Sequence, residues 1–109
     1  MRSLIILLAL SILATSCASY IYTHSADQTY PSKIENCKFK VVNTAPNPAE
    51  YVEIGSINSQ DFYATAKNPE DWKSIIAKDV CAAGGDLVVS EINGYGQYIR
   101  GTVFVRKAN

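Results

Sequence analysis

The sequence is poor in the residues that most often build metal and catalytic sites. It contains one histidine, His24, and three cysteines, with no Cys-x-x-Cys pair. A single imidazole with so few thiols cannot supply an ordinary zinc site or a Ser-His-Asp set. His24 itself lies in a stretch that we interpret as a solvated linker, where a catalytic base would lack rigid support. We therefore expect no metal, no cofactor and no enzymatic activity.

An excess of charge of one sign is also absent, because 10 basic residues stand against 10 acidic ones. Proteins that bind nucleic acid rely on clustered Lys and Arg side chains to contact phosphates. No such stripe occurs along this chain. The composition therefore argues against nucleic acid as a partner.

A third absence is an apolar run long enough to cross a bilayer. The run over residues 4–14 falls short of the roughly 20 residues that a membrane-spanning helix needs. Arg2 precedes the run, and the small residues Ala14 and Ser16 stand at positions −3 and −1 relative to Cys17. A basic start, a short apolar region and a small-x-small site are typical of a secretory signal.

The letters LATSC at residues 13–17 resemble the lipobox of bacterial lipoproteins. The resemblance implies that residues 1–16 are removed and that Cys17 is acylated, with a palmitate-type chain, to anchor the protein in a lipid bilayer. Ala18, rather than Asp, implies sorting to the outer membrane, facing the periplasm. Ordinary cleavage at the same bond, or after Ala18, would instead give a soluble periplasmic or secreted protein.

Acylation of Cys17 leaves Cys37 and Cys81 as a possible disulfide pair, and an exported compartment permits oxidation. In the loop-entropy model, a bridge closing about 45 residues contributes roughly 4 kcal/mol. On a helical wheel, however, Cys81 lies about 180° from Trp72, which is on the apolar stripe. We therefore expect the bridge only if Cys37 lies at a sheet edge or on a segment that wraps the flank of the helix.

The sequence divides into a linker and one domain. Residues 18–36 show no sustained periodicity and are rich in Ser, Thr, Asn and Asp. We interpret residues 17–36 as the lipidated cysteine with a flexible tether that lets the domain stand clear of the membrane. The single folded domain is expected over residues 37–109.

A helix after Asn68 has the clearest local signals. Asn68 is a suitable N-cap and Pro69 fits the first helical position, while Gly84 and Gly85 end the helix. Five apolar residues recur with helical spacing and predict the buried stripe: Trp72, Ile75, Ile76, Val80 and Ala83.

Two carboxylates near this helix could be taken for catalytic acids. Asp79 lies at the edge of the apolar stripe, and Asp86 directly follows the double glycine. We interpret Asp79 as solvated or paired with a lysine, and Asp86 as a residue that stabilises the turn.

Alternating and β-branched residues predict four strands, and Asn93-Gly94 predicts a hairpin between the last two. Gly55, in the second strand, marks a bulge or a close contact. The expected fold is α+β, a four-stranded sheet in the order β-β-α-β-β with one amphipathic helix packed on one face. The predicted strands are residues 37–43, 51–58, 86–92 and 97–105.

The last strand has apolar residues on both faces. We expect Ile99, Val103 and Val105 to face the helix, and Tyr98 and Phe104 to lie on the opposite face. An apolar patch on an exposed sheet face favours association. We therefore predict that Tyr98 and Phe104 form a surface for an envelope protein partner or for self-association.

Three segments, YVEIGSI, AKDVCAAGGDLVV and GTVFV, span Tyr51 to Val105. They resemble small bacterial envelope lipoproteins with a dodecin-like domain, a loose group that includes the outer-membrane stress sensor of the Rcs phosphorelay. The pattern is a strand ending in Ile54-Gly55 and a helix ending at Gly84–Asp86. The resemblance implies a non-enzymatic interaction or sensory module on a lipid anchor. The alternative is a soluble periplasmic or secreted domain that binds a ligand or oligomerises.

Overall fold

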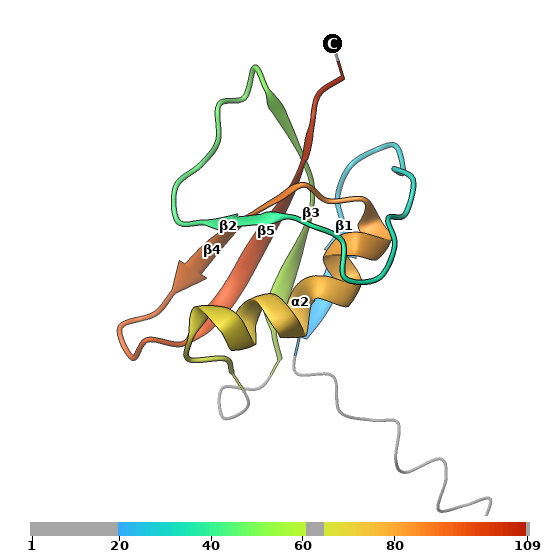
Figure 1. Cartoon of the computed structure of the whole chain (residues 1–109). Coiled ribbons are helices and arrows are strands. Elements are labelled where there is room, and N and C mark those ends of the chain that lie inside the picture. Colours follow the sequence, from blue (N-terminus) through green and yellow to red (C-terminus); the bar gives the residue numbers. More distant parts are fainter. Residues whose placement is uncertain (1–19, 61–64, 109) are drawn as a thin grey trace, which may run out of the picture.

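The computed structural model describes residues 20–60 and 65–108. Within these residues the chain forms one α-helix and five β-strands (Figure 1). No helix of the described part is long and apolar enough to cross a bilayer. In chain order the elements are β1 (Tyr20–His24), β2 (Lys40–Val42), β3 (Tyr51–Ser59), α2 (Pro69–Ala83), β4 (Leu87–Ile92) and β5 (Tyr98–Arg106).

The strands form a single mixed sheet in the order β1-β3-β5-β4-β2. All neighbouring strands are antiparallel except β2 and β4, which are parallel. The architecture remains α+β, but the expected four-stranded sheet is wrong because β1 adds a fifth strand. That strand comes from residues 17–36, which we interpreted as a tether. The sheet therefore begins within the supposed tether, at Tyr20, and not at residue 37.

Strand β1 is held in the sheet by a buried tyrosine. The Tyr20 hydroxyl donates to the carbonyl oxygen of Tyr98 at 2.8 Å and accepts from the amide of Ala66 at 2.9 Å. Its ring also packs edge-on against Trp72, with the ring centroids 5.1 Å apart. A buried side chain with its polar atom fully paired stabilises the strand. Tyr20 therefore belongs to the hydrophobic core of the domain.

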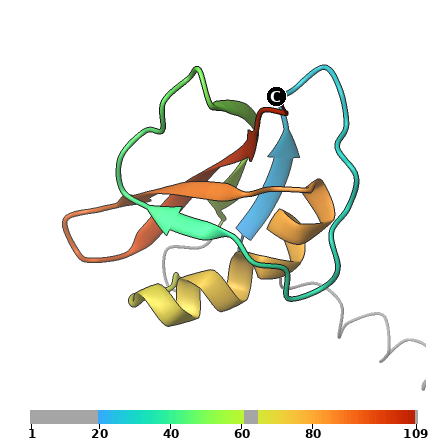
Figure 2. The ribbon, with the colours of Figure 1, turned by 45° about the horizontal axis from the view of Figure 1, so that its top comes forward.

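Residues 25–39 wrap the flank of the helix between β1 and β2, as Figure 2 shows. The amide of Lys33 donates to the carbonyl oxygen of Cys81 at 2.8 Å, and the Ser32 hydroxyl donates to that of Ala82 at 2.6 Å. Both acceptors are carbonyl groups of the last helical turn, where amide partners within the helix run out, although that of Cys81 also accepts from the amide of Gly84 at 3.1 Å. The segment therefore serves as part of the folded domain.

The predicted helix and its caps are confirmed. The side chain of Asn68 accepts from the amide of Asp71 at 2.9 Å, and Gly84 ends the helix with a φ of 81°. The predicted stripe is wrong at Ile75, which is 45% exposed. The buried face is instead rotated toward Cys81, because residues 25–39 cover that flank of the helix.

Trp72 lies at the centre of the contact between helix and sheet and is completely buried. Its indole N–H donates to the Ser90 hydroxyl at 2.7 Å, and its ring stacks on Tyr98 with centroids 5.2 Å apart. A Cβ atom at Gly101 would lie 2.8 Å from the indole ring, closer than side chains pack. The glycine therefore lets the tryptophan lie directly on the sheet.

A bulge in β5 corrects the expected position of Tyr98. The ladder between β4 and β5 skips Ile99, and an extra residue reverses the alternation beyond it. Tyr98 therefore turns toward the helix, where it is 7% exposed and stacks on Trp72. Its assignment to the opposite face is wrong. Val103 and Val105 pack against the core as expected, but Ile99 is not among the residues that do.

Two predictions based on glycines, the bulge at Gly55 and the hairpin at Asn93-Gly94, agree with the structure in most respects. The register of β3 shifts around Ile54, so the expected bulge is present, and a Cβ at Gly55 would lie 2.6 Å from the carbonyl oxygen of Thr23. The hairpin between β4 and β5 is also confirmed. Its positive φ of 77° lies at Gly96, however, and not at Asn93 or Gly94.

Candidate functional site

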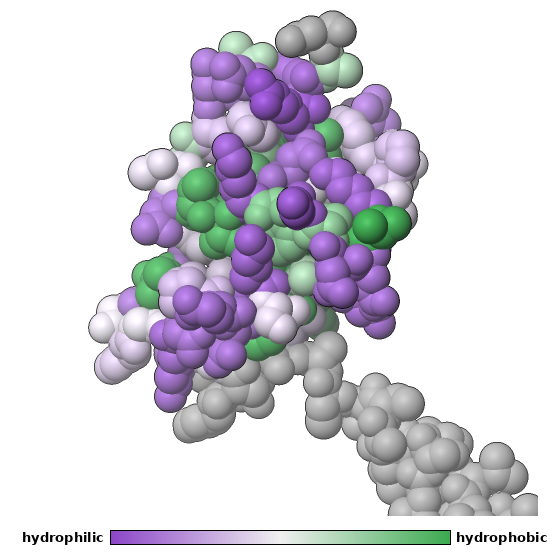
Figure 3. All heavy atoms as spheres, viewed as in Figure 1, coloured by the Kyte–Doolittle hydropathy of each residue, from purple (hydrophilic) through white to green (hydrophobic). Residues whose placement is uncertain are grey.

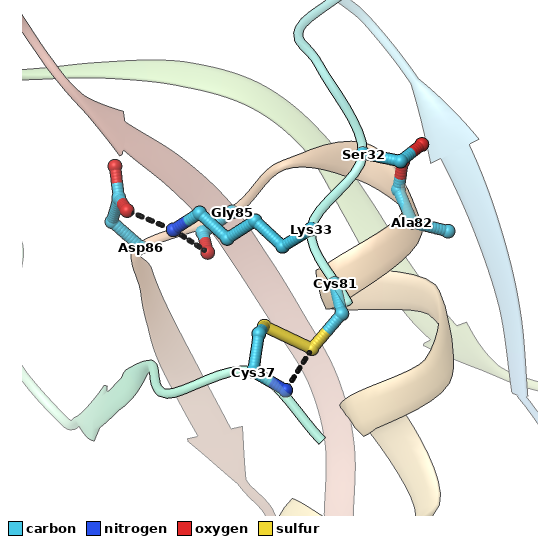
Figure 4. The surroundings of a disulfide bond; sticks show 7 residues. All are labelled: Ser32, Lys33, Cys37, Cys81, Ala82, Gly85 and Asp86. Atoms are coloured by element: carbon cyan, nitrogen blue, oxygen red, sulfur yellow. Dashed lines mark hydrogen bonds and ion pairs between the residues drawn. A yellow bond between two sulfur atoms is a disulfide. The ribbon is translucent and has the colours of Figure 1, made fainter. Parts of the chain in front are cut away.

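The structure contains the Cys37–Cys81 disulfide, with the two Cα atoms 5.7 Å apart (Figure 4). Cys81 lies on α2, and Cys37 lies on the segment that wraps the flank of that helix. The amide of Cys37 also donates to the Cys81 sulfur at 3.2 Å. The expected geometric condition for the bridge is therefore met, and the predicted pairing is confirmed.

Noncovalent contacts surround the bridge. The Lys33 ammonium forms an ion pair with Asp86 and donates to the carbonyl oxygen of Gly85 at 3.0 Å. The last turn of α2 has no basic residue of its own, so Lys33 supplies the positive charge that favours a helix C-terminus. We call this group the clasp: Ser32, Lys33 and Cys37 on one segment, and Cys81, Ala82, Gly85 and Asp86 opposite (Figure 4).

Asp86 does more than stabilise a turn. One carboxylate oxygen pairs with Lys33, and the other accepts from the amide of Arg106 at 2.7 Å. The carboxylate thus joins the wrapping segment, the start of β4 and the end of β5. Both carboxylate oxygens are therefore occupied by partners within the domain.

His24 is held more firmly than a linker residue would be. Its Nε2 contacts the carbonyl oxygen of Gln28 at 2.8 Å, and its Nδ1 contacts the Tyr22 hydroxyl at 2.9 Å. Because a carbonyl can only accept, Nε2 is the donor in the contact with Gln28. His24 is exposed, as expected for a solvated residue, but it lies on β1, so its assignment to a linker is wrong.

The phenolate form of Tyr22 is disfavoured in this pair. Burial, and secondarily the negative charge of Asp79, raise the pKa of Tyr22 above 10.0. The phenol therefore stays protonated at neutral pH and acts as a hydrogen-bond donor. Across residues 20–60 and 65–108, no group of three or more His, Cys, Asp and Glu side chains could hold a metal ion.

The predicted partner surface is smaller than expected. Phe104 is half-buried on the face away from the helix, between its cross-strand neighbours Leu87 and Glu53. Tyr98 is not beside it, for the reason given above. The side of the molecule that carries α2 is also mostly hydrophilic, with hydrophobic patches interrupted by polar side chains (Figure 3). An association surface at Phe104 stays a prediction.

The predicted lipidation site, Cys17, lies outside the described residues, as does the signal peptide over residues 1–16. Only two residues, Ala18 and Ser19, separate Cys17 from Tyr20, the first residue of β1. This spacing matters for any membrane anchor, because the sheet begins almost immediately after it.

Comparisons with protein-family models, with curated proteins and with solved structures give no match to this chain. The resemblance to dodecin-like envelope lipoproteins therefore stays a prediction. The motifs that carry it have local roles here: Gly55 admits the neighbouring β1 strand, and Gly84 caps the helix. Both roles concern the backbone and assign no ligand.

Proposed function

We propose that this chain is a bacterial envelope lipoprotein, anchored by acylated Cys17, whose disulfide-bonded α+β domain is a non-enzymatic interaction module. The observation that carries the proposal is the Cys37–Cys81 bridge. It consumes two of the three cysteines and leaves the one that follows the small-x-small signal. Structural disulfides persist in oxidising compartments such as the periplasm, which supports export.

The position of β1 changes what the anchor does. The three backbone steps from Cys17 to Tyr20 reach at most about 10 Å even when fully extended. With Cys17 acylated, the start of β1 at Tyr20 stands against the lipid headgroups, and the domain does not hang on a long tether. One end of the sheet is thereby fixed next to the membrane.

The register of the sheet identifies which residues share that end. Tyr20 pairs with Ser59, and Ile92 pairs with Tyr98 at the mouth of the β4–β5 hairpin. Figure 1 shows the hairpin and the start of β1 at the same end of the sheet, opposite the C-terminus. We call this the anchor end: the first residues of β1, the last of β3 and the β4–β5 hairpin.

Exposed apolar side chains at the anchor end suit a lipid surface. Tyr95, at the tip of the hairpin, is 88% exposed, and Ile21 and Ile92 are about half exposed. Tyrosine is favoured at membrane interfaces, where its ring is apolar and its hydroxyl remains hydrated. Contact with the headgroup region would therefore cover side chains that face water in the isolated domain.

The experiment that tests the anchor is mass spectrometry of the mature N-terminus after expression of the full chain in a Gram-negative bacterium. We expect an acylated Cys17 as the first residue, incorporation of labelled palmitate, and loss of both in Cys17→Ser. The Cys37→Ser/Cys81→Ser variant is the matched control and should still be acylated. An unmodified N-terminus, or cleavage after Ala18, would contradict the proposal and support the soluble alternative.

A further inference from the structure

We propose that the end of the domain opposite the anchor binds a small phosphate-type oxyanion. A cavity of about 290 Å³ opens there, near the small end of the range for ligand sites. This distal end comprises the start of β2, the start of β3 and the end of β5, which the register places side by side. The lining residues are Lys38, Phe39, Lys40, Tyr51, Asp86 and Arg106.

The charge of the cavity is uncompensated. The ion pairs of the described residues are Lys33–Asp86 and Glu91–Arg100, so Lys38, Lys40 and Arg106 have no carboxylate partner among residues 20–60 and 65–108. A concave surface lined by one sign of charge concentrates counter-ions. The cavity therefore attracts an anion.

Asp86, the only acidic residue of the lining, does not cancel this charge. Its two oxygens are occupied by the Lys33 ammonium and the Arg106 amide, as described for the clasp. Nearby, the Lys107 ammonium is used in a hydrogen bond of 2.7 Å to the carbonyl oxygen of Pro48. Other lysines of the described residues also lack a carboxylate partner, but Lys38, Lys40 and Arg106 are the ones that line this cavity.

The side chains present favour an oxyanion with several acceptor atoms. The guanidinium of Arg106 offers paired N–H groups that match phosphate oxygens, and lysine ammonium groups add point charges. The half-buried Tyr51 lines the same cavity, and its phenol is a hydrogen-bond donor. Phe39 is buried and forms an apolar wall.

Isothermal titration of the full mature protein with inorganic phosphate, at low ionic strength and with chloride as the control anion, tests this site. We expect saturable binding of phosphate and none of chloride. Arg106→Gln and Lys40→Gln should each weaken binding by about tenfold or more, since each removes one charge-assisted hydrogen-bonding group. Both side chains are exposed, so thermal unfolding should confirm that the variants fold.

Lys78→Gln is the matched control, because Lys78 is an exposed lysine of α2 outside the cavity. It should leave phosphate binding unchanged. Glycerol 3-phosphate distinguishes the source of the anion: binding at least as tight as phosphate indicates a phosphate monoester, and weaker binding indicates the free ion. Absence of saturable binding, or equal losses in Lys78→Gln and Arg106→Gln, would overturn the proposal.

Discussion

The two ends of the helix are fastened to the rest of the domain by different forces. Near the anchor end, Trp72 lies between the rings of Tyr20 and Tyr98 in the aromatic cluster, and its contacts are buried. At the other end, the clasp uses a disulfide, an ion pair and backbone hydrogen bonds at the surface. One end therefore depends on burial, and the other depends on covalent and ionic bonds.

This difference suits the proposed location. An oxidising compartment keeps a disulfide formed, so the covalent bond of the clasp persists there. The aromatic cluster is insensitive to redox state and lies beside the strand that would follow the lipid anchor. The comparison predicts that reductant and salt should act on the clasp, whereas removal of buried hydroxyl groups should act on the aromatic cluster.

The largest effect should follow removal of the bridge. Cys37→Ser/Cys81→Ser should lower the free energy of unfolding by about 2–5 kcal/mol, because the unfolded chain regains the freedom that the bridge restricts. Urea denaturation of the oxidised protein and of the variant measures this difference. Cys17→Ser should leave stability unchanged, and an equal loss in that control would contradict the assigned pairing.

A smaller effect should follow Tyr20→Phe. The substitution leaves the Ala66 amide and the Tyr98 carbonyl without their buried partner and should cost about 1–3 kcal/mol. Urea denaturation in the presence and absence of reductant should give the same loss, because the aromatic cluster does not depend on the bridge. Tyr95→Phe, at an exposed tyrosine, should be neutral.

A still smaller effect should follow Lys33→Met, which removes the ion pair of the clasp. Lys33 and Asp86 are each about one-third exposed, so the expected loss is roughly 1 kcal/mol or less. The loss should shrink as salt rises, because mobile ions screen the pair. A loss that is independent of salt would show that the aliphatic part of Lys33, and not its charge, stabilises the clasp.

The smallest effect concerns alkaline pH. Burial raises the pKa of Tyr20 above 10.0, although the hydrogen bond from Ala66 acts in the opposite direction. The unfolded chain therefore loses this proton first, and stability should fall as pH rises from about 10 through the folded-state pKa, with no change below. Denaturation at about pH 8 and 11 should show a smaller fall for Tyr20→Phe than for the wild type.

The sequence predicts the helix well because its signals are local. Asn68, Pro69 and Gly84 act within one turn of the positions they define. Strand β1 was missed for the opposite reason. The alternation of Tyr20 and Tyr22 with Ile21 is a signal for a strand. The signal is weak, because the strand has only five residues and lies in a polar region. The contacts that bury Tyr20 come from residues far along the chain.

The candidate site was predictable to a similar extent. The pairing of Cys37 with Cys81 was predicted from the cysteine count, whereas the helical wheel counted against it unless a segment wrapped the flank of the helix. The structure contains that segment and the bridge. The position of Tyr98 was not predictable, because simple alternation fails at a bulge that has no sequence signal at Ile99. The distal cavity was not predictable either, because its residues come from the ends of β2, β3 and β5, which are distant in the sequence and adjacent only in the folded sheet.

The orientation of the domain on a bilayer is the most direct test of the central claim, a sheet held against the membrane by acylated Cys17. Mature protein carrying Tyr95→Trp or Ala45→Trp is reconstituted into vesicles that contain brominated lipid, and tryptophan fluorescence is measured. Trp72 is buried and common to both variants. Marked quenching for Tyr95→Trp with little for Ala45→Trp is predicted. Equal quenching of the two, or none in either, would contradict the account.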